Sequence, residues 1–457
     1  MKYAIWKRIA LVVLVGVGLM IPMTMIMGLI AERQNAQRGV LSDIAQSSTG
    51  EQSIMGPVLV VSYKRKVIHT QIVKDDKGVE KEKKTEQIHD ETLAFLPESL
   101  DIAGDVRTFE KRRGIYTARL YTAPLKIKGR FVVPKVYQTQ GGAGAFDFGN
   151  ARLAIGIADP RGIKNSPALQ LGEHKVAFVS GANAPGMAAG MHADLGMLAD
   201  NQTNTIDFAF DLDLQGMERL FFVPTGKSTQ VSLISNWPHP SFYGRHLPEP
   251  KVAGEANQTD GFSAKWRTSH FSTNMAVLYD ECVSSPAKCA SLSNNGFGVS
   301  LIQPANVYQQ LERSAKYGFL FVGLTLIAFF LYEVLKRLAI HPIQYGLVGI
   351  ALAMFYLLLT SLSEHISFDI AYAIASAACI GLLTFYVSYV LQSAMRGMSF
   401  GALLGALYGA LYVLLRSEDH SLLLGSGLLF ALLAAVMVGT RKVDWYRVGE
   451  GLASRKS

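Results

Sequence analysis

Five polar residues that could carry out chemistry lie close together at the end of an apolar run. Ser361, Ser363, Glu364 and His365 follow the apolar residues 350–359, and Asp369 lies just inside the next apolar run. On a helix, Ser361 shares a face with Glu364 and His365. Ionisable groups there are costly unless they face water, protein or one another. We therefore predict a turn at a membrane surface, with a spanning helix on either side, and call these five residues the polar lip.

The polar lip has two functional interpretations and one structural interpretation. It could relay protons or form the polar wall of a small-ligand site, because intramembrane ionisable groups tend to be retained for a use. The structural alternative is a helix end whose polar side chains meet headgroups and water. A second polar turn, at residues 416–420, would add Glu418, Asp419 and His420 if the two turns meet, but its spacing has no metal signature.

A serine-hydrolase pattern, G-x-S-x-G, occurs at residues 397–401 with Ser399 at its centre. The pattern supports catalysis when a strand–turn–helix exposes the serine, whereas here it opens an apolar helix. We therefore predict no catalytic residue, no cofactor and no metal site. Gly401, Gly405 and Gly409 recur every four residues and are predicted to let another helix approach closely.

The net charge of +8 does not indicate nucleic-acid binding once the charges are located. Residues 31–315 carry 31 Lys and Arg against 29 Asp and Glu, so this part is nearly neutral. The remaining 13 basic residues lie in or beside apolar segments. Basic residues collect in the cytoplasmic loops of membrane proteins. The excess charge is therefore a topology signal, and the predicted surroundings are a lipid bilayer.

Six apolar stretches are long enough to cross a bilayer. The first, residues 9–30, follows Lys2, Lys7 and Arg8 and is too long for a cleaved signal peptide. It is predicted to be an uncleaved anchor, kinked at Pro22. Alternating crossings put both termini in the cytoplasm and leave only two of the 13 basic residues, Lys316 and Arg416, on the other side. The other five predicted spans are residues 317–335, 343–362, 368–391, 398–415 and 422–439.

Residues 31–315 are predicted to form an exported β-rich domain, with two lobes as one option. Residues 206–214 alternate Ile, Phe and Leu with Asp, the pattern of a half-buried strand. The charged piece at residues 74–84 is predicted to be a hairpin loop. The full division is an anchor at 1–30, the β-rich domain at 31–315, a five-helix bundle at 316–440 and a basic cytoplasmic tail at 441–457. Further predicted strands are 57–63, 67–73, 87–96, 115–120, 125–132, 151–157, 175–179, 218–223 and 230–235.

Three cysteines occur in the sequence. Cys379 lies in an apolar run and is most simply a core residue. Cys282 and Cys289 lie in a loop rich in Ser, Pro and Ala, and an exported loop favours a disulfide between them. Two free thiols or half of a metal site are the alternatives, and no nearby histidine completes a ligand set.

Several stretches together resemble the CreD family of bacterial inner-membrane proteins. They are STGEQSIMGPVLVVSY, LAIGIADPRGI, NWPHPSFYGRHLP and the long segment from Ile340 to Ala377 that contains SLSEH. The resemblance implies a Gram-negative inner-membrane protein with a periplasmic domain. It also implies a role in envelope integrity, with production under the CreBC two-component system and links to colicin tolerance and β-lactam response. The family has no established catalytic activity, so it supplies no site residues.

Three functions are compatible with these patterns. The first is a non-enzymatic membrane protein that supports the envelope, whose exported domain contacts an unknown envelope protein or ligand. The second is a transporter or lipid-handling protein that uses the polar lip as a binding site. The third is an intramembrane enzyme, which only the G-x-S-x-G pattern around Ser399 supports.

Overall fold

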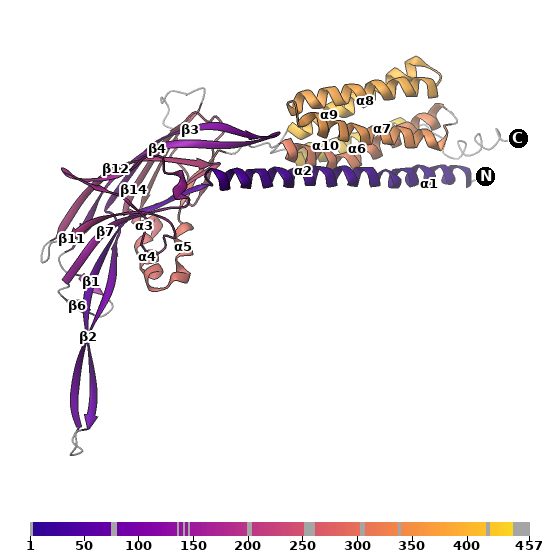
Figure 1. Cartoon of the computed structure of the whole chain (residues 1–457). Helices are drawn as coiled ribbons and strands as arrows, with labels where there is room; N and C mark the ends of the chain where they lie inside the picture. Colours follow the sequence, from indigo (N-terminus) through magenta and orange to yellow (C-terminus); the bar gives the residue numbers. More distant parts are fainter. Residues whose placement is uncertain are drawn as a thin grey trace. The chain divides into compact units, whose positions relative to one another are not determined.

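The computed structural model describes residues 3–74, 80–134, 137–139, 142–144, 147–198, 203–250, 261–301, 307–336, 340–416 and 421–441. The chain divides into two compact units. One contains Met1–Gly39 with Ala305–Ser457 and is helical, and the other contains Val40–Pro304 and is β-rich (Figure 1). The predicted architecture, apolar helices on either side of a large β-rich domain, is confirmed. The predicted boundaries at residues 31 and 316 lie inside helices, because both helices continue beyond their apolar parts.

The helices of the first unit follow the apolar stretches of the sequence. Within the described residues, five stretches are long and apolar enough to cross a membrane: Val12–Ser47, Val307–Leu331, Pro342–Ser363, Phe368–Val390 and Ala394–Arg416. The sixth predicted span coincides with a helix that contains no charged residue. The helices are α1 (Tyr3–Gly18), α2 (Met20–Ser47), α6 (Val307–Lys336), α7 (Pro342–Ser363), α8 (Phe368–Val390), α9 (Ala394–Arg416) and α10 (Ser421–Thr440).

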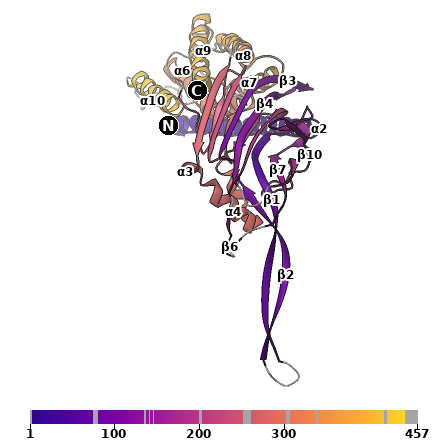
Figure 2. The same cartoon turned by 90° about the vertical axis from the view of Figure 1, so that its left-hand side faces the viewer.

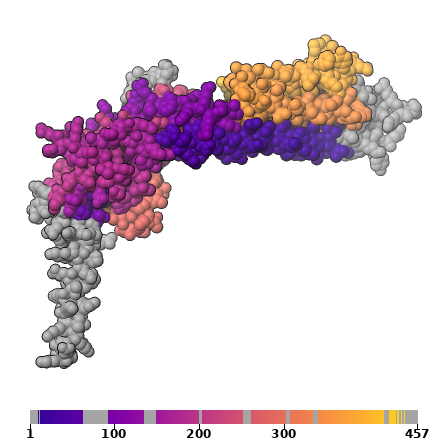
Figure 3. All heavy atoms as spheres, in the orientation of Figure 1, coloured from indigo at the N-terminus to yellow at the C-terminus, as the bar shows by residue number. Residues whose placement is uncertain are grey.

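The N-terminal helix packs along the bundle through two glycines of other helices. It is interrupted at Leu19, three residues before Pro22, so that Pro22 lies in the first turn of α2, where its missing N–H is tolerated. Leu19 packs against Gly349 of α7 and Met23 against Gly318 of α6, where a Cβ would overlap the incoming side chain. Small residues permit such close approach between helices in a membrane. Figure 3 shows this helix in indigo beside the orange bundle.

Aromatic side chains fill the interior of the bundle between α6, α7 and α9. The ring of Phe321 lies 4.5 Å from that of Tyr408, and Phe355 lies 4.6 Å from the same tyrosine. One level further along, the rings of Phe329 and Phe400 are 5.7 Å apart. The Phe321–Tyr408 and Phe329–Phe400 pairs both join α6 to α9, so these two helices run antiparallel with a fixed register.

The β-rich unit is a sandwich of two large sheets (Figure 2). In the first sheet the strand order is β10-β11-β7-β1-β13-β17-β15, with β2 also paired to β1; in the second it is β16-β14-β3-β4-β12-β8-β9. Two short strands, β5 (Tyr137–Thr139) and β6 (Gly142–Gly144), pair separately. First-sheet strands are β1 (Gln52–Lys74), β2 (Glu80–Phe95), β7 (Asp147–Ile157), β10 (Val179–Ser180), β11 (Gly190–Met197), β13 (Arg219–Val223), β15 (Ser241–Gly244) and β17 (Phe297–Ser300). Second-sheet strands are β3 (Ser99–Arg113), β4 (Tyr116–Val133), β8 (Ala168–Leu171), β9 (His174–Ala177), β12 (Asn204–Met217), β14 (Ser228–Ser235) and β16 (Phe262–Ser269).

One hydrophobic core lies between the two sheets. In β12, Phe208, Phe210, Leu212 and Leu214 are buried in this core, while the aspartates between them are exposed, as their alternation predicts. The core draws on strands of both sheets, so the described part of the domain is one sandwich and not two lobes. Short helices cover the other face of the first sheet: α3 (His270–Thr273), α4 (Met275–Ser284) and α5 (Ala290–Ser293) (Figure 1).

Most predicted strands occur, with longer bounds. Residues 57–63 and 67–73 form the single strand β1, and residues 115–120 and 125–132 form the single strand β4. The predicted hairpin loop is shorter than expected, because β2 begins at Glu80; residues 75–79 lie outside the described residues. Eight of the described strands were not predicted: β3, β5, β6, β8, β11, β15, β16 and β17. In β3, Ala103 and Gly104 interrupt the apolar alternation that marks a half-buried strand.

Candidate functional site at helix α2

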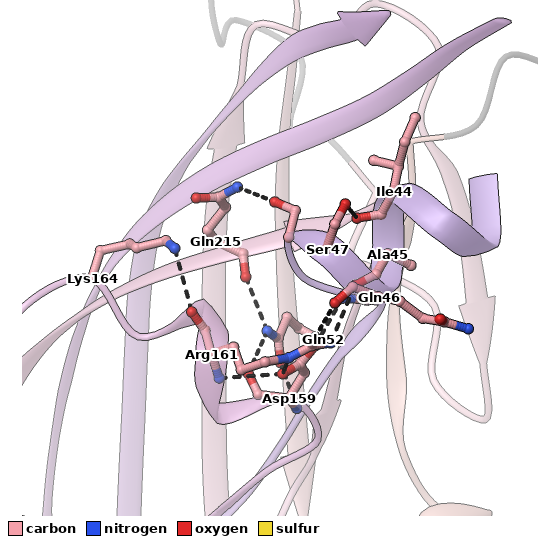
Figure 4. Close-up of polar contacts among 11 residues, drawn as sticks. Ile44, Ala45, Gln46, Ser47, Gln52, Asp159, Arg161, Lys164 and Gln215 are labelled. Atoms are coloured by element: carbon pink, nitrogen blue, oxygen red, sulfur yellow. Dashed lines mark hydrogen bonds and ion pairs between the residues drawn. The ribbon is translucent and has the colours of Figure 1, made fainter. Parts of the chain in front are cut away.

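The last turn of α2 is held by an arginine of the β-rich unit (Figure 4). The final carbonyls of a helix have no partner within it. Arg161, in the 3-10 turn η1 (Pro160–Gly162), donates from Nη1 to the carbonyl of Gln46 and from Nη2 to that of Ala45 at 3.1 Å. A cation at this position also favours the negative end of the helix dipole. Arg161 therefore closes the C-terminus of α2 from outside the helix.

Asp159 orients this arginine. Its carboxylate accepts from Arg161 Nε at 2.8 Å and from Nη2 at 2.6 Å, the paired geometry in which Arg binds carboxylates most strongly. It also accepts from the backbone N–H of Gly50 at 2.9 Å. The hydrogen bond from Arg161 is the largest cause that lowers the pKa of Asp159 to about 2, with the N–H of Gly50 adding to it. The Asp159 carboxyl is therefore ionised across the physiological pH range.

Gln52 joins this pair to the second sheet. Its side-chain amide donates to the carbonyls of Asp159 and Gln215, both at 2.9 Å, and its oxygen accepts from the Asp159 N–H at 3.2 Å. Gln215 in turn donates to Ser48 Oγ at 3.2 Å, immediately after α2. Gln52 is 1% exposed, so its polar atoms require these partners. We call Gln52, Asp159, Arg161 and Gln215 the junction cluster.

An apolar contact accompanies the junction cluster. Ile44, in the last turns of α2, is 2% exposed and packs with Ala118, Leu120 and Met217 of the second sheet. The end of α2 is thus bound to the sandwich by buried apolar area and by charged hydrogen bonds. Hydropathy did not indicate this cluster, because its residues lie in three separate stretches of the sequence.

In the helical unit, α2 contacts the polar lip through Arg33. The Nε of Arg33 lies 3.4 Å from Glu364 Oε1, and the Glu364 side chain is only 13% exposed. Glu364 occupies the C-cap of α7, where the chain turns toward α8. The polar lip therefore contacts a basic residue of the N-terminal helix that the sequence patterns did not associate with it.

The other lip residues do not gather around Glu364. Asp369 accepts from Tyr412 Oη at 2.9 Å, and Arg416 donates to the same hydroxyl at 3.0 Å, so Asp369 belongs to a contact between α8 and α9. Ser361 and His365 are exposed. Ser363 is buried, and its Oγ has no hydrogen-bond partner among the described residues. Glu418, Asp419 and His420 lie outside the described residues.

The carboxyl group of Glu333 in α6 is buried. Its side chain is 4% exposed, and it accepts from Tyr345 Oη of α7 at 2.5 Å. Only the tyrosine at the fourth position of α7 could have indicated this contact, and tyrosines are common at membrane interfaces.

The predicted glycine stripe on α9 is displaced by one turn. Gly397 and Gly401 approach α8 so closely that a Cβ would overlap Ser388 and Thr384 respectively. Nothing in the described structure lies within 4 Å of a Cβ at Gly405 or Gly409, so the prediction fails for these two. Ser399 donates to the carbonyl of Arg396 at 2.8 Å, inside a continuous helix and not in a strand–turn–helix.

Cys282 and Cys289 form a disulfide in the structure, between α4 and the start of α5. Cys282 is buried among residues that cover the first sheet, including Met275, Tyr279 and Leu292. Cys379 is a buried free cysteine in α8. Among the residues that the structure describes, no group of three or more His, Cys, Asp or Glu side chains could hold a metal ion.

The stretches that hold α2 are those by which the sequence resembles a known family. Gln52 lies in STGEQSIMGP, Asp159 and Arg161 in ADPRG, and Glu364 in SLSEH. The sequence profile described as inner membrane protein CreD matches residues 4–446. This chain belongs to the CreD family. The inner membrane protein CreD of Escherichia coli (strain K12) is 34% identical over 434 residues, which cover 94% of this chain and 91% of the relative. The chain is therefore an inner-membrane protein, and the predicted CreD resemblance is confirmed.

Proposed function

We propose that this CreD-family protein supports the cell envelope without catalysis, with α2 transmitting changes between its β-sandwich and its polar lip. The observation that carries this proposal is that one helix has an ion pair at Arg33 and a second charged contact at residues 45–46. These points are 12 residues apart in the sequence of α2.

Two further observations support a structural and signalling role over the enzymatic and transporter alternatives. The side chains that could have formed a catalytic cluster have separate partners, since Glu364 pairs with Arg33 and Asp369 with Tyr412. The transporter alternative requires the lip to form a common binding surface. Aromatic rings fill the adjoining interior of the bundle, which gives that alternative less support.

We further propose that the β-sandwich is periplasmic and that both termini are cytoplasmic. The excess of basic residues beside the predicted cytoplasmic ends of the spans supports this orientation. An oxidising compartment is also compatible with the Cys282–Cys289 disulfide. Protease added to spheroplasts should cut within the sandwich and leave a C-terminal tag intact. Loss of the tag in intact spheroplasts would refute this orientation.

The transmission role is tested by reversing the charges of the ion pair. In a deletion strain, Arg33→Glu and Glu364→Arg should each reduce tolerance of envelope stress at matched membrane abundance. The double variant should recover tolerance, because it restores the pair with opposite polarity. The same reversal of Arg130 and Asp207, an exposed pair on the sandwich, is the matched control and should have no effect. Full tolerance from both single variants would make the Arg33–Glu364 contact dispensable and contradict the proposal.

A further inference from the structure

An apolar slot lies between three helices of the bundle. It has a volume of about 360 Å³ and is lined by residues of α6, α9 and α10. The lining is apolar except for the Tyr317 hydroxyl and Ser426, and it includes Leu320 of α6, Leu414 of α9 and Gly425 of α10. Figure 2 shows α10 on the side of α6 and α9 that faces away from α8.

The slot persists because α10 presents no bulky side chain at its centre. Gly425 faces α9, and a Cβ there would meet only Leu414 Cδ1, at an ordinary contact distance of 3.5 Å. On other faces of α10, Leu423 is 71% exposed and Phe430 is 74% exposed. These faces are suited to lipid, as expected of a spanning helix at the edge of a bundle.

A basic residue, Lys316, directly precedes the first residue of α6 that lines the slot. Lys316 precedes Tyr317 and lies four residues before Leu320, so it shares the slot-facing side of α6. Its side chain is 60% exposed and pairs with Glu312 at 2.8 Å. An exposed pair of this kind contributes little to stability, so the lysine can exchange its partner. Lys316 is also one of the two basic residues beside the apolar segments that the predicted topology does not place in the cytoplasm.

We propose that the slot binds one acyl chain of a phospholipid whose phosphate is bound by Lys316. Its volume of about 360 Å³ argues for a chain over a helix, because a single helical turn about 10 Å across and 5.4 Å high already occupies more space. Lipid tails have no hydrophobic preference for an apolar protein surface, so selectivity must come from close packing in the slot and from the charged headgroup. The site is independent of the α2 contacts on which the proposed function rests.

The acyl-chain part is tested by filling the slot. The full-length protein, purified in detergent, is titrated with phosphatidylglycerol and the bound lipid is measured by native mass spectrometry. Gly425→Leu should reduce binding at least fivefold, because the new side chain enters the slot. Gly427→Leu is the matched control: a Cβ there meets nothing within 4 Å in the described structure, and binding should be unchanged. Equal binding by both variants would overturn the slot assignment.

The headgroup part is tested without altering the packing. Lys316→Gln should weaken binding of phosphatidylglycerol about fivefold, the effect of one lysine near an anionic surface. Arg416→Gln removes a charge from α9 that contacts Tyr412, which does not line the slot, and should have no such effect. Glycerol phosphate, which has no acyl chain, should not compete. Competition by glycerol phosphate would indicate a free-phosphate site, and an unchanged affinity for Lys316→Gln would remove this lysine from the site.

Discussion

Replacing Asp159 by asparagine should measure how strongly the junction cluster holds α2. The substitution keeps the size of the side chain and removes the charge that Arg161 binds through two nitrogens. The pKa of Asp159 falls from an ordinary 3.8 to about 2. A shift of this size corresponds to about 2 kcal/mol of stability at neutral pH. Because Arg161 is 55% exposed and partly screened by solvent, this value is an upper estimate.

The effect should have a defined pH dependence. A carboxyl group whose pKa is lowered by folding stabilises the folded state above its unfolded pKa, near 4. That stabilisation is lost as the pH falls from about 4 toward 2, because the folded protein must then also bind the proton. The difference between wild type and Asp159→Asn should therefore be constant from pH 5 to 7 and should shrink below pH 4.

The assay is urea unfolding followed by tryptophan fluorescence. Trp237 and Trp266 both lie in the sandwich, so Trp6→Phe and Trp445→Phe in all proteins restrict the signal to that unit. Asp207→Asn is the matched control, because Asp207 and its partner Arg130 are 63% and 54% exposed. The control should lose less than about 1 kcal/mol. If Asp159→Asn lies within about 0.5 kcal/mol of the control at pH 7, the junction cluster does not hold α2 as argued.

Two further predictions concern the helices and the disulfide. Gly401→Leu should reduce the yield of folded protein in detergent, because a side chain at residue 401 overlaps Thr384. Gly405→Leu is the control and should give the wild-type yield. Size-exclusion chromatography compares the two variants, and equal elution profiles would contradict the packing argument. When the protein is denatured without reductant, an alkylating agent should modify Cys379 alone. Replacing both Cys282 and Cys289 by alanine should destabilise the α4–α5 segment by about 2 kcal/mol, as expected for the loss of a disulfide that closes a short loop. Mass spectrometry and local hydrogen exchange measure these effects.

The sequence patterns predicted the spans well because the bilayer imposes a simple rule on them. About 20 apolar residues are needed to cross it, and the strand alternation of residues 206–214 is an equally local signal. Contacts between distant residues are a different matter. The junction cluster joins Gln52, Asp159 and Gln215, which are more than 50 residues apart in each case. No periodicity within one stretch can report such a contact, so only the family resemblance singled out the segments of Gln52 and Asp159, and it did not include Gln215.

The glycine stripe shows how a local pattern can identify the right helix and the wrong turn. The spacing of Gly401, Gly405 and Gly409 defines one face of α9, but a face has no marker for where the neighbouring helix crosses it. The crossing point depends on α8, where Thr384 and Ser388 approach Gly401 and Gly397. Predicting that point would require the register of both helices, which interior contacts such as the hydrogen bond from Tyr372 Oη of α8 to the Tyr408 carbonyl of α9 fix in the structure.

Helix α2 shows why hydropathy alone underestimated the N-terminal segment. The predicted anchor ends at Ile30, where apolar residues give way to AERQNAQRGVLSDIAQS, yet the helix continues to Ser47. Hydropathy reports where the bilayer ends, whereas helix propensity and tertiary contacts decide where the helix ends. Ala, Glu, Arg and Gln in this extension are good helix formers, and Arg161 satisfies its last carbonyls. The polar extension carries both Arg33 and the residues bound by Arg161. The part of the helix that hydropathy could not assign is therefore the part to which we attribute transmission.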